Sequence, residues 1–422
     1  MSTVSRGLPR QPHLDVPRRE ARELLNACRQ SEPQAFERIR RRHPKFKHTP
    51  DSGLTAVIRL SDAQLVIARE YGLARWTELK ERITSNDVAW QLDAAIRAND
   101  VEKVVRLLGD NPKLLHVPVR SGNWGPPLSH AANLGKLEVM KAIAPLGARD
   151  FQHAFDRALL QSRLDCAKWL HEQGAKLLPG IVMGCCETLS IDGLRFLHEL
   201  DAPFGDGRGN HLAPLAMILE TYGRKPAGKH QMLDLLEQRG QRFPDTPIMA
   251  FHRGQTDRLR EQLKRDPGLP SRCFTYREIY PPELGCADDG RSGCHGTPIG
   301  GVTLLHLAIE FDEQEIFELL LEHGADVNAR ALVDADGFGG HTPLFSAVVN
   351  ASIANGRQRD AAMARALLQR GADPSVRVNV RKFMDWCETP GWHEARNVTA
   401  AEWARGYPDN GSINKDALRL LD

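Results

Sequence analysis

The chain has 422 residues, of which 41% are hydrophobic, 26% charged and 6% aromatic, and its formal net charge is +2. These values are typical of a folded protein and argue against a disordered polyelectrolyte. A chain of this length usually divides into two or more domains, and it contains no stretch of about 18 apolar residues that would predict a membrane span.

The N-terminal part differs from the rest in charge and composition. Residues 1–50 carry 12 Lys and Arg against 5 Asp and Glu. Residues 1–19 contain several prolines and predict a flexible leader. Residues 20–86 then show the apolar spacing of short helices. We therefore expect a leader, a small helical region at 20–86 and a third region from 87 to 422.

Most of the chain repeats one pattern, and residues 301–330 are the clearest copy. The small side chain of Ala308 allows two helices to approach each other closely. Leu319 and Leu320 belong to an apolar stripe on the second helix. Gly324 suits the left-handed residue that ends a helix. About nine such helix pairs predict an all-α solenoid with a small N-terminal helical region, because one pair cannot bury its own apolar face.

Two short motifs recur in these helix pairs. The first appears as TLLHLA at 303–308, as TPLFSA at 342–347 and loosely as PPLSHA at 126–131. The second appears as LLEHGAD at 320–326 and as LLQRGAD at 367–373. With both motifs the chain resembles the ankyrin repeat family, whose signatures are T-P-L-H-x-A and L-L-x-x-G-A-D.

The resemblance covers roughly residues 90–422 and implies an ankyrin solenoid that binds a protein or peptide. Ankyrin arrays typically bind through hairpin tips and the concave face of the inner helices. The segment 59–83 also resembles a leader found before such repeats in bacterial proteins. Eight cysteines without a CxxC pair, and an N-terminus without the apolar core of a signal peptide, favour a reducing compartment. We therefore expect a non-catalytic recognition scaffold in a bacterial cytoplasm.

Insertions interrupt the repeats near 223–229, 270–300, 350–361 and 377–396. Loops of this length are uncommon without a function of their own, and the insertion at 270–300 is the preferred contact loop. Exposed aromatic side chains and neighbouring charges supply much of the binding energy of interfaces. The expected partner-binding residues are Arg120, Trp124, Tyr276, Tyr280, Asp336, Phe338 and Arg381.

A metal site in the same insertion is an alternative. Cys273, Cys286, Cys294 and His295 have side chains that suit zinc. Structural zinc sites favour ligands two to four residues apart, whereas Cys294 and His295 are adjacent. An ordered loop with free thiols is therefore the preferred interpretation, and a metal-dependent enzyme or regulator at these residues remains the alternative.

Two basic segments suggest further alternatives. GRKPAGKH at 223–230 fits the start of a phosphate-binding loop, but no strand precedes it, and we interpret it as a loop between helices. The stretch 38–47 could bind nucleic acid, although a solvated helix end is the simpler interpretation. His130 and His306 occupy motif positions where ankyrin histidines make structural hydrogen bonds. Since no HExxH or GxSxG motif occurs, an enzyme is disfavoured.

Overall fold

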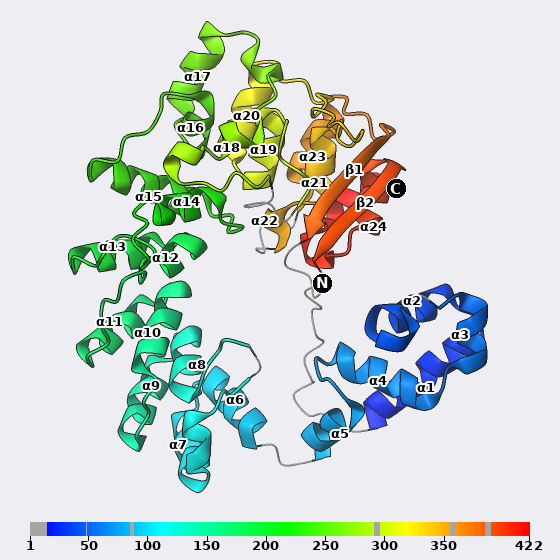
Figure 1. Ribbon diagram of the computed structural model, residues 1–422, viewed down its shortest axis with the longest axis vertical. Coiled ribbons are helices and arrows are strands. Elements are labelled where there is room, and N and C mark those ends of the chain that lie inside the picture. Colours follow the sequence, from blue (N-terminus) through cyan, green and yellow to red (C-terminus); the bar gives the residue numbers. More distant parts are fainter. Residues whose placement is uncertain are drawn as a thin grey trace. The chain divides into compact units, whose positions relative to one another are not determined.

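The computed structural model describes residues 15–47, 49–84, 88–120, 122–290, 296–354, 360–384 and 390–422. Contacts divide the chain into two compact units, one ending at Leu114 and one running from Leu115 to Asp422. Figure 1 shows their helices and strands.

Five helices of the first unit form a small bundle with its own core. Apolar residues of α1 are buried with the i, i+3, i+4 and i+7 spacing of one helix face, and α1 packs on α2 and α4. A helix pair, α6 and α7, follows the bundle. The helices are α1 (Asp15–Arg29), α2 (Pro33–Arg42), α3 (Asp51–Val57), α4 (Leu60–Glu70), α5 (Trp76–Thr84), α6 (Val88–Ala98) and α7 (Val101–Asp110), with short 3-10 helices at Pro44–Phe46 and Pro112–His116.

The second unit is a row of helix pairs. First helices stack on first helices, as α8 does on α10 and α10 on α12, and second helices pack in the same order, as α11 does on α13. This arrangement confirms the predicted helical solenoid. The pairs are α8 (Pro127–Leu134) with α9 (Leu137–Ile143), α10 (Phe151–Leu160) with α11 (Leu164–Glu172), α12 (Met183–Thr188) with α13 (Ile191–Glu199), α14 (Ala213–Glu220) with α15 (Pro226–Gln238), α16 (Pro247–His252) with α17 (Thr256–Arg265), α19 (Leu304–Phe311) with α20 (Gln314–Glu322), α21 (Pro343–Val348) with α23 (Ala362–Gln369), and α24 (Ala400–Gly406) with α25 (Lys415–Arg419).

Helix α19 lies in the centre of the core. Every residue of α19 is buried, and α20 buries four apolar residues of its stripe. Gly324 follows α20 with a φ of +76°, in the left-handed region that a glycine adopts without strain. The apolar stripe and the terminal glycine of residues 301–330 therefore correspond to a stacked helix pair.

The insertion at 270–300 is part of the core. It contains α18 (Tyr276–Ile279) and 3-10 helices at Leu269–Ser271 and Pro282–Leu284. Phe274 forms a β-bridge with Val302, and the side chains of Phe274 and Tyr280 are almost completely buried. The insertion expected near 223–229 is shorter than predicted, because α15 already begins at Pro226, a residue suited to a first helical turn.

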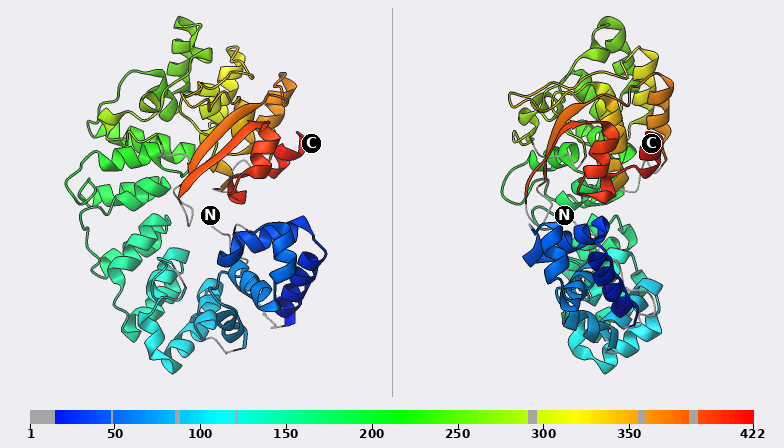
Figure 2. Two further views of the ribbon diagram at one scale, coloured as in Figure 1. Left: turned by 45° about the vertical axis from the view of Figure 1, so that its right-hand side comes forward. Right: turned by 90° about the vertical axis from the view of Figure 1, so that its right-hand side faces the viewer.

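A β-hairpin occupies most of the insertion at 377–396. Strands β1 (Val378–Met384) and β2 (Gly391–Val398) pair antiparallel, with Arg381 opposite Glu394 and Phe383 opposite Trp392. Figure 2 shows the hairpin from two further sides. One face is buried on α24, where the His393 ring stacks on Trp403 at 5.0 Å. No strands were expected at these residues from the sequence.

The remaining described elements are short. They are helix α22 (Ala351–Ala354) and 3-10 helices at Ala144–Leu146 and Asn410–Ser412. In the part of the chain that the structure describes, none of the helices combines the length and the apolar character needed to cross a membrane.

Candidate recognition surface

The tip between α20 and α21, residues 332–339, is a tightly turned loop. Val333 and Gly339 form a β-bridge, and the Asp334 carboxylate accepts hydrogen bonds from the N–H groups of Asp336 at 3.0 Å and Phe338 at 2.9 Å. Burial opposes ionisation of Asp334, but the hydrogen bond from Phe338 and the guanidinium of Arg381 outweigh it and lower the pKa of Asp334. The tip is thus fixed by its own backbone.

The tip packs along the edge of β1 that faces away from β2. The Arg381 guanidinium binds Asp334 Oδ2 at 2.8 Å and Asp336 Oδ2 at 2.7 Å. Gly339 N–H donates to the carbonyl of Asn379 at 2.8 Å. The tip, which connects two helix pairs, and the hairpin, which is an insertion, therefore form one surface.

Arginine and aromatic side chains alternate across this surface. The guanidinium carbons of Arg381 and Arg396 lie 4.7 and 4.3 Å from the centre of the Phe338 ring. Arg381 also lies 5.0 Å from the Trp392 ring, and Phe383 meets Trp392 edge-on at 5.4 Å. Cation–π and edge-to-face contacts of this kind each contribute about 0.5–1 kcal/mol. The side chains are consequently held in place before any partner binds.

We name this surface the hairpin platform. Its most exposed apolar groups are Val333 at 62%, Leu332 at 56% and Trp392 at 51%, which are also the three most exposed large hydrophobic side chains among the described residues. Such side chains cost free energy in water unless another molecule covers them. The platform consists of Leu332, Val333, Asp334, Asp336, Phe338, Arg381, Phe383, Trp392, Glu394 and Arg396.

Three predicted partner-binding residues, Asp336, Phe338 and Arg381, meet in the platform although they were identified in two separate segments. Phe338 is only 4% exposed, so its prediction as an exposed anchor is wrong; its ring instead supports two guanidinium groups. Sequence reasoning missed Trp392 and Arg396. The alternation of W-x-E-x-R in residues 392–396 has the period of a half-buried strand and could have identified them.

The comparison with known families agrees with this geometry. A family model described as ankyrin repeats (3 copies) matches residues 284–378, which include α19, α20, α21, α23 and the tip. Residues 284–378 are ankyrin repeats. Such repeats are generally protein-interaction modules. The hairpin begins where the matched ankyrin segment ends, and no curated protein matches the chain.

Two other predicted residues lie together at the start of the pair α8–α9, outside the matched ankyrin segment. The Arg120 guanidinium lies 5.6 Å from the ring of Trp124, and Trp124 meets His130 edge-on at 5.5 Å. Arg120 is exposed and Trp124 is half-buried.

The tyrosines of the 270–300 insertion do not form an exposed pair. Tyr280 is fully buried, and its ring stacks on His252 at 6.0 Å. Tyr276 is half-buried and meets Tyr280 edge-on at 5.2 Å. The prediction of Tyr280 as an exposed anchor is wrong, because the insertion folds onto the neighbouring helix pairs and buries it.

The predicted zinc ligands have different surroundings. The half-buried Cys273 thiol lies 3.6 Å from the carbonyl oxygen of Arg330. Cys286 is buried, and desolvation raises the pKa of its thiol to about 12. Within the described ranges, no group of three or more metal-ligating side chains occurs. Cys294 and His295 lie outside the described residues.

A cluster of charged groups is buried beside the insertion. Arg224 binds Glu310 Oε1 at 3.0 Å, with both side chains inaccessible to solvent. His252 Nε2–H donates to the carbonyl of Ile279 at 2.8 Å, so Nδ1 accepts from Lys229 Nζ at 2.7 Å. Burial and the charge of Arg224 lower the pKa of Lys229 to about 7. Perturbed groups of this kind suggest catalysis when a substrate can reach them, but Lys229 and His252 are buried inside the array.

The segment 223–230 therefore has a structural role. Its Arg224 and Lys229 side chains, which a phosphate-binding loop would present to a ligand, are directed into the core and join three helix pairs. His306 is likewise structural, since it is hydrogen-bonded to Thr303 at 2.9 Å and to the carbonyl of His341 at 3.2 Å.

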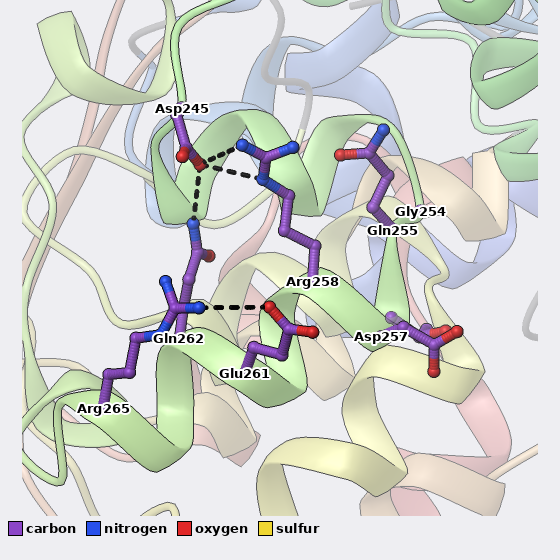
Figure 3. A pocket seen from close by; sticks show the side chains of 9 residues that line it. Asp245, Gly254, Gln255, Asp257, Arg258, Glu261, Gln262 and Arg265 are labelled. Carbon is purple, nitrogen blue, oxygen red and sulfur yellow. Dashed lines mark hydrogen bonds and ion pairs between the residues drawn. The ribbon is translucent and has the colours of Figure 1, made fainter.

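A wide depression along α17 has no apolar anchor. Figure 3 shows that its polar side chains pair with one another: Asp245 accepts from Arg258 at 2.8 Å, and Arg265 donates to Glu261 at 3.4 Å. Since ligand sites are usually lined by apolar groups with a few convergent polar ones, this depression is an ordinary polar surface.

Part of the basic stretch 38–47 is engaged within its own unit. Arg38 forms two hydrogen bonds of 2.9 Å with Glu70, and Arg40 pairs with Asp51. The ring of Phe46 is 2% exposed. Two of the arginines and the aromatic ring of this stretch are therefore not available for contacts with a nucleic acid.

Proposed function

We propose that the chain is a non-catalytic scaffold for recognising a protein or peptide, with the hairpin platform as its main contact surface. The observation that carries this proposal is the exposure of Trp392 beside the paired charges of Arg381, together with the exposure of Leu332 and Val333 in the tip that Arg381 binds. Interfaces are enriched in aromatic and arginine side chains, and few such groups supply most of the affinity.

The fixed conformation of the platform supports this role. Arg381 is held by two carboxylates, and its side chain is only 22% exposed. Ordering a mobile side chain on binding costs about 0.5–1.5 kcal/mol, and a side chain already ordered avoids this cost. Trp392 is therefore already held in one conformation by its neighbours before a partner binds.

Other predicted surfaces take a lesser part in the proposal. The inner helix faces and the Arg120–Trp124 pair provide a second contact area on the same array. We also propose a cytoplasmic location, which five buried free thiols support because they need no oxidising compartment. The bacterial origin rests on the resemblance of residues 59–83 alone.

Affinity capture with variants tests the proposal. The tagged chain and its Trp392→Ala and Arg396→Ala variants would be used to capture proteins from a lysate, with quantitative mass spectrometry of the bound species. We expect a protein bound by the wild type to be lost from both variants. Leu178→Ala is the matched control, because Leu178 is 46% exposed and lies outside the platform. A partner retained by both platform variants would refute the surface assignment.

A further inference from the structure

Strand β2 lies at the edge of the two-stranded sheet. The carbonyl of Asn379 in β1 accepts from Gly339 in the tip, so this carbonyl points away from β2. Peptide groups alternate in direction along a strand. The residues of β1 that direct their backbone groups toward β2 are therefore Val380, Lys382 and Met384.

The register then identifies the open edge. The partners of these three residues are Ala395, His393 and Gly391. The two residues between them, Trp392 and Glu394, must direct their N–H and C=O groups away from β1. Both residues are exposed, and neither backbone is hydrogen-bonded elsewhere within the described ranges.

The edge is short and has a defined end. A register shift separates Val378 from Val380, and on the opposite strand Asn397 has a φ of +52°. Such a bulge interrupts regular pairing. The edge therefore has room for a few residues of an added strand, between Gly391 and Ala395.

We propose that a partner protein binds here by adding an extended segment as a third strand on β2. This inference rests on the proposed function and specifies the partner's conformation. Trp392 and Glu394 supply four backbone groups for the ladder, and strand addition of this kind derives its affinity from main-chain hydrogen bonds. Exposed edge strands are templates for this pairing unless they are covered or blocked.

The side chains of the edge specify the chemistry of the segment. Trp392 and Glu394 project from the exposed face, so alternate residues of an added strand lie beside them. An apolar residue complements Trp392, and a basic residue complements Glu394. The partner is thus an extended segment with an apolar and a basic residue two positions apart.

A second copy of the chain fits this edge less well. Two β2 strands paired antiparallel about Glu394 would place like charges directly opposite each other, which destabilises a sheet. Pairing about His393 would place Trp392 beside Glu394 of the other copy. Trp392 would then lack an apolar neighbour, and Glu394 would lack a basic one. The edge therefore favours a different chain.

Random short peptides displayed on phage are the probe for this proposal. The full chain would be used for selection, and the selected peptides would be synthesised for affinity measurements. We expect sequences with an apolar and a basic residue two positions apart. Methylating the peptide nitrogens one at a time should weaken binding about tenfold at alternate positions and little at the positions between, since only alternate N–H groups face β2.

A proline in β2 tests the same geometry from the protein side. Glu394→Pro removes an N–H group that points away from β1, and proline is tolerated at such edge positions. Peptide binding by Glu394→Pro should be about tenfold weaker than binding by Glu394→Thr, the control, which also lacks the carboxylate but keeps the N–H group. Circular dichroism would verify that both variants fold, and the methylated peptides need no variant at all.

The outcomes separate this inference from the proposed function. Peptides that require Trp392 but tolerate Glu394→Pro and every N-methyl group would overturn strand addition and leave the recognition surface intact. Selection of no peptide, or binding unaffected by Trp392→Ala, would count against both. Self-association in sedimentation velocity that Glu394→Pro abolishes would identify a second copy as the occupant and overturn the proposal of a different chain.

Discussion

The insertion at 270–300 and the hairpin at 378–398 both interrupt the row of helix pairs, and both carry aromatic side chains. The first buries Phe274 and Tyr280 in the core, whereas the second leaves Trp392 51% exposed. Burial of the first pair stabilises the array. The exposed part of the Trp392 side chain adds nothing to the stability of the fold until another molecule covers it. Aromatic content alone therefore does not distinguish a structural insertion from a binding one.

The two insertions also use charge differently. Beside the first, Arg224 and Glu310 form an ion pair that no solvent reaches, together with the hydrogen bond of Lys229 to His252. In the hairpin platform, the acidic partners of Arg381 are exposed by 41% and 67%. Breaking a buried pair leaves an uncompensated charge, while breaking an exposed one costs little. The free energies of unfolding should therefore respond very differently to mutations in the two insertions.

The largest effect is expected at Tyr280. Replacing it with alanine removes a fully buried aromatic side chain and should reduce the free energy of unfolding by about 3–5 kcal/mol. Urea denaturation followed by circular dichroism measures this change. The half-buried Tyr276 is the matched control, and Tyr276→Ala should cost clearly less. Equal small losses in both variants would show that the insertion does not belong to the core.

Acid should loosen the attachment of the same insertion. His341 donates from Nε2 to the carbonyl of Pro298 at 2.9 Å, and burial lowers the pKa of His341 to about 4. The unfolded chain, with an ordinary value near 6.5, binds the proton first as the pH falls. The contribution of His341 to stability is therefore complete above pH 6.5 and is lost at about 1.4 kcal/mol per pH unit down to pH 4.

The control for this pH dependence is His341→Gln, which keeps a donor but cannot titrate. Between pH 7 and pH 4, the wild type should lose about 3 kcal/mol more stability than the variant in urea denaturation. The neighbouring His306, whose pKa burial lowers to about 3, stays in both proteins and contributes to both curves. Parallel curves would show that His341 titrates normally in the folded state.

Local patterns in the sequence were sufficient to predict the helix pairs. The stripe of Leu319 and Leu320 and the left-handed Gly324 are each determined within one turn of helix, so the 301–330 unit could be placed without knowing its neighbours. The strands at 378–384 and 391–398 also have a local signal. Apolar and polar side chains alternate from Val378 to Arg381, in step with the alternating burial of β1, whereas Lys382 on the buried face departs from this pattern.

The burial of Tyr280 and Phe338 could not be predicted in this way. Tyr280 is buried because α18 folds onto His252, which lies in another helix pair. Phe338 is covered by Arg381 and Arg396, which are more than forty positions away in the sequence. An aromatic residue in a loop has the same local pattern whether its ring is covered or exposed. The choice of anchors therefore needed contacts between segments that are far apart in the sequence.

In the hairpin, Trp392→Ala should affect stability much less than Tyr280→Ala. The side chain is half exposed, and its contacts with Arg381 and Phe383 are worth about 1–2 kcal/mol together. Urea denaturation should therefore show a loss of about 1–2 kcal/mol. A loss as large as that of Tyr280→Ala would mean that Trp392 serves the fold, and the reduced capture of a partner by this variant would then have a structural cause.

The smallest effect is expected at Asp336. Its carboxylate is 67% exposed, and Arg381 keeps its second partner, Asp334, when Asp336 is replaced. Asp336→Asn should therefore change the free energy of unfolding by no more than about 0.5 kcal/mol. Asp334→Ala is the informative comparison, because alanine lacks the oxygen that accepts the N–H groups of Asp336 and Phe338, which shape the tip. It should cost about 1 kcal/mol, and the difference should persist in 1 M salt, since hydrogen bonds within the turn are screened less than an exposed ion pair. If both variants lost the same stability, and salt removed both losses, the tip would be held to β1 by charge attraction alone, and the hairpin platform would not be preformed.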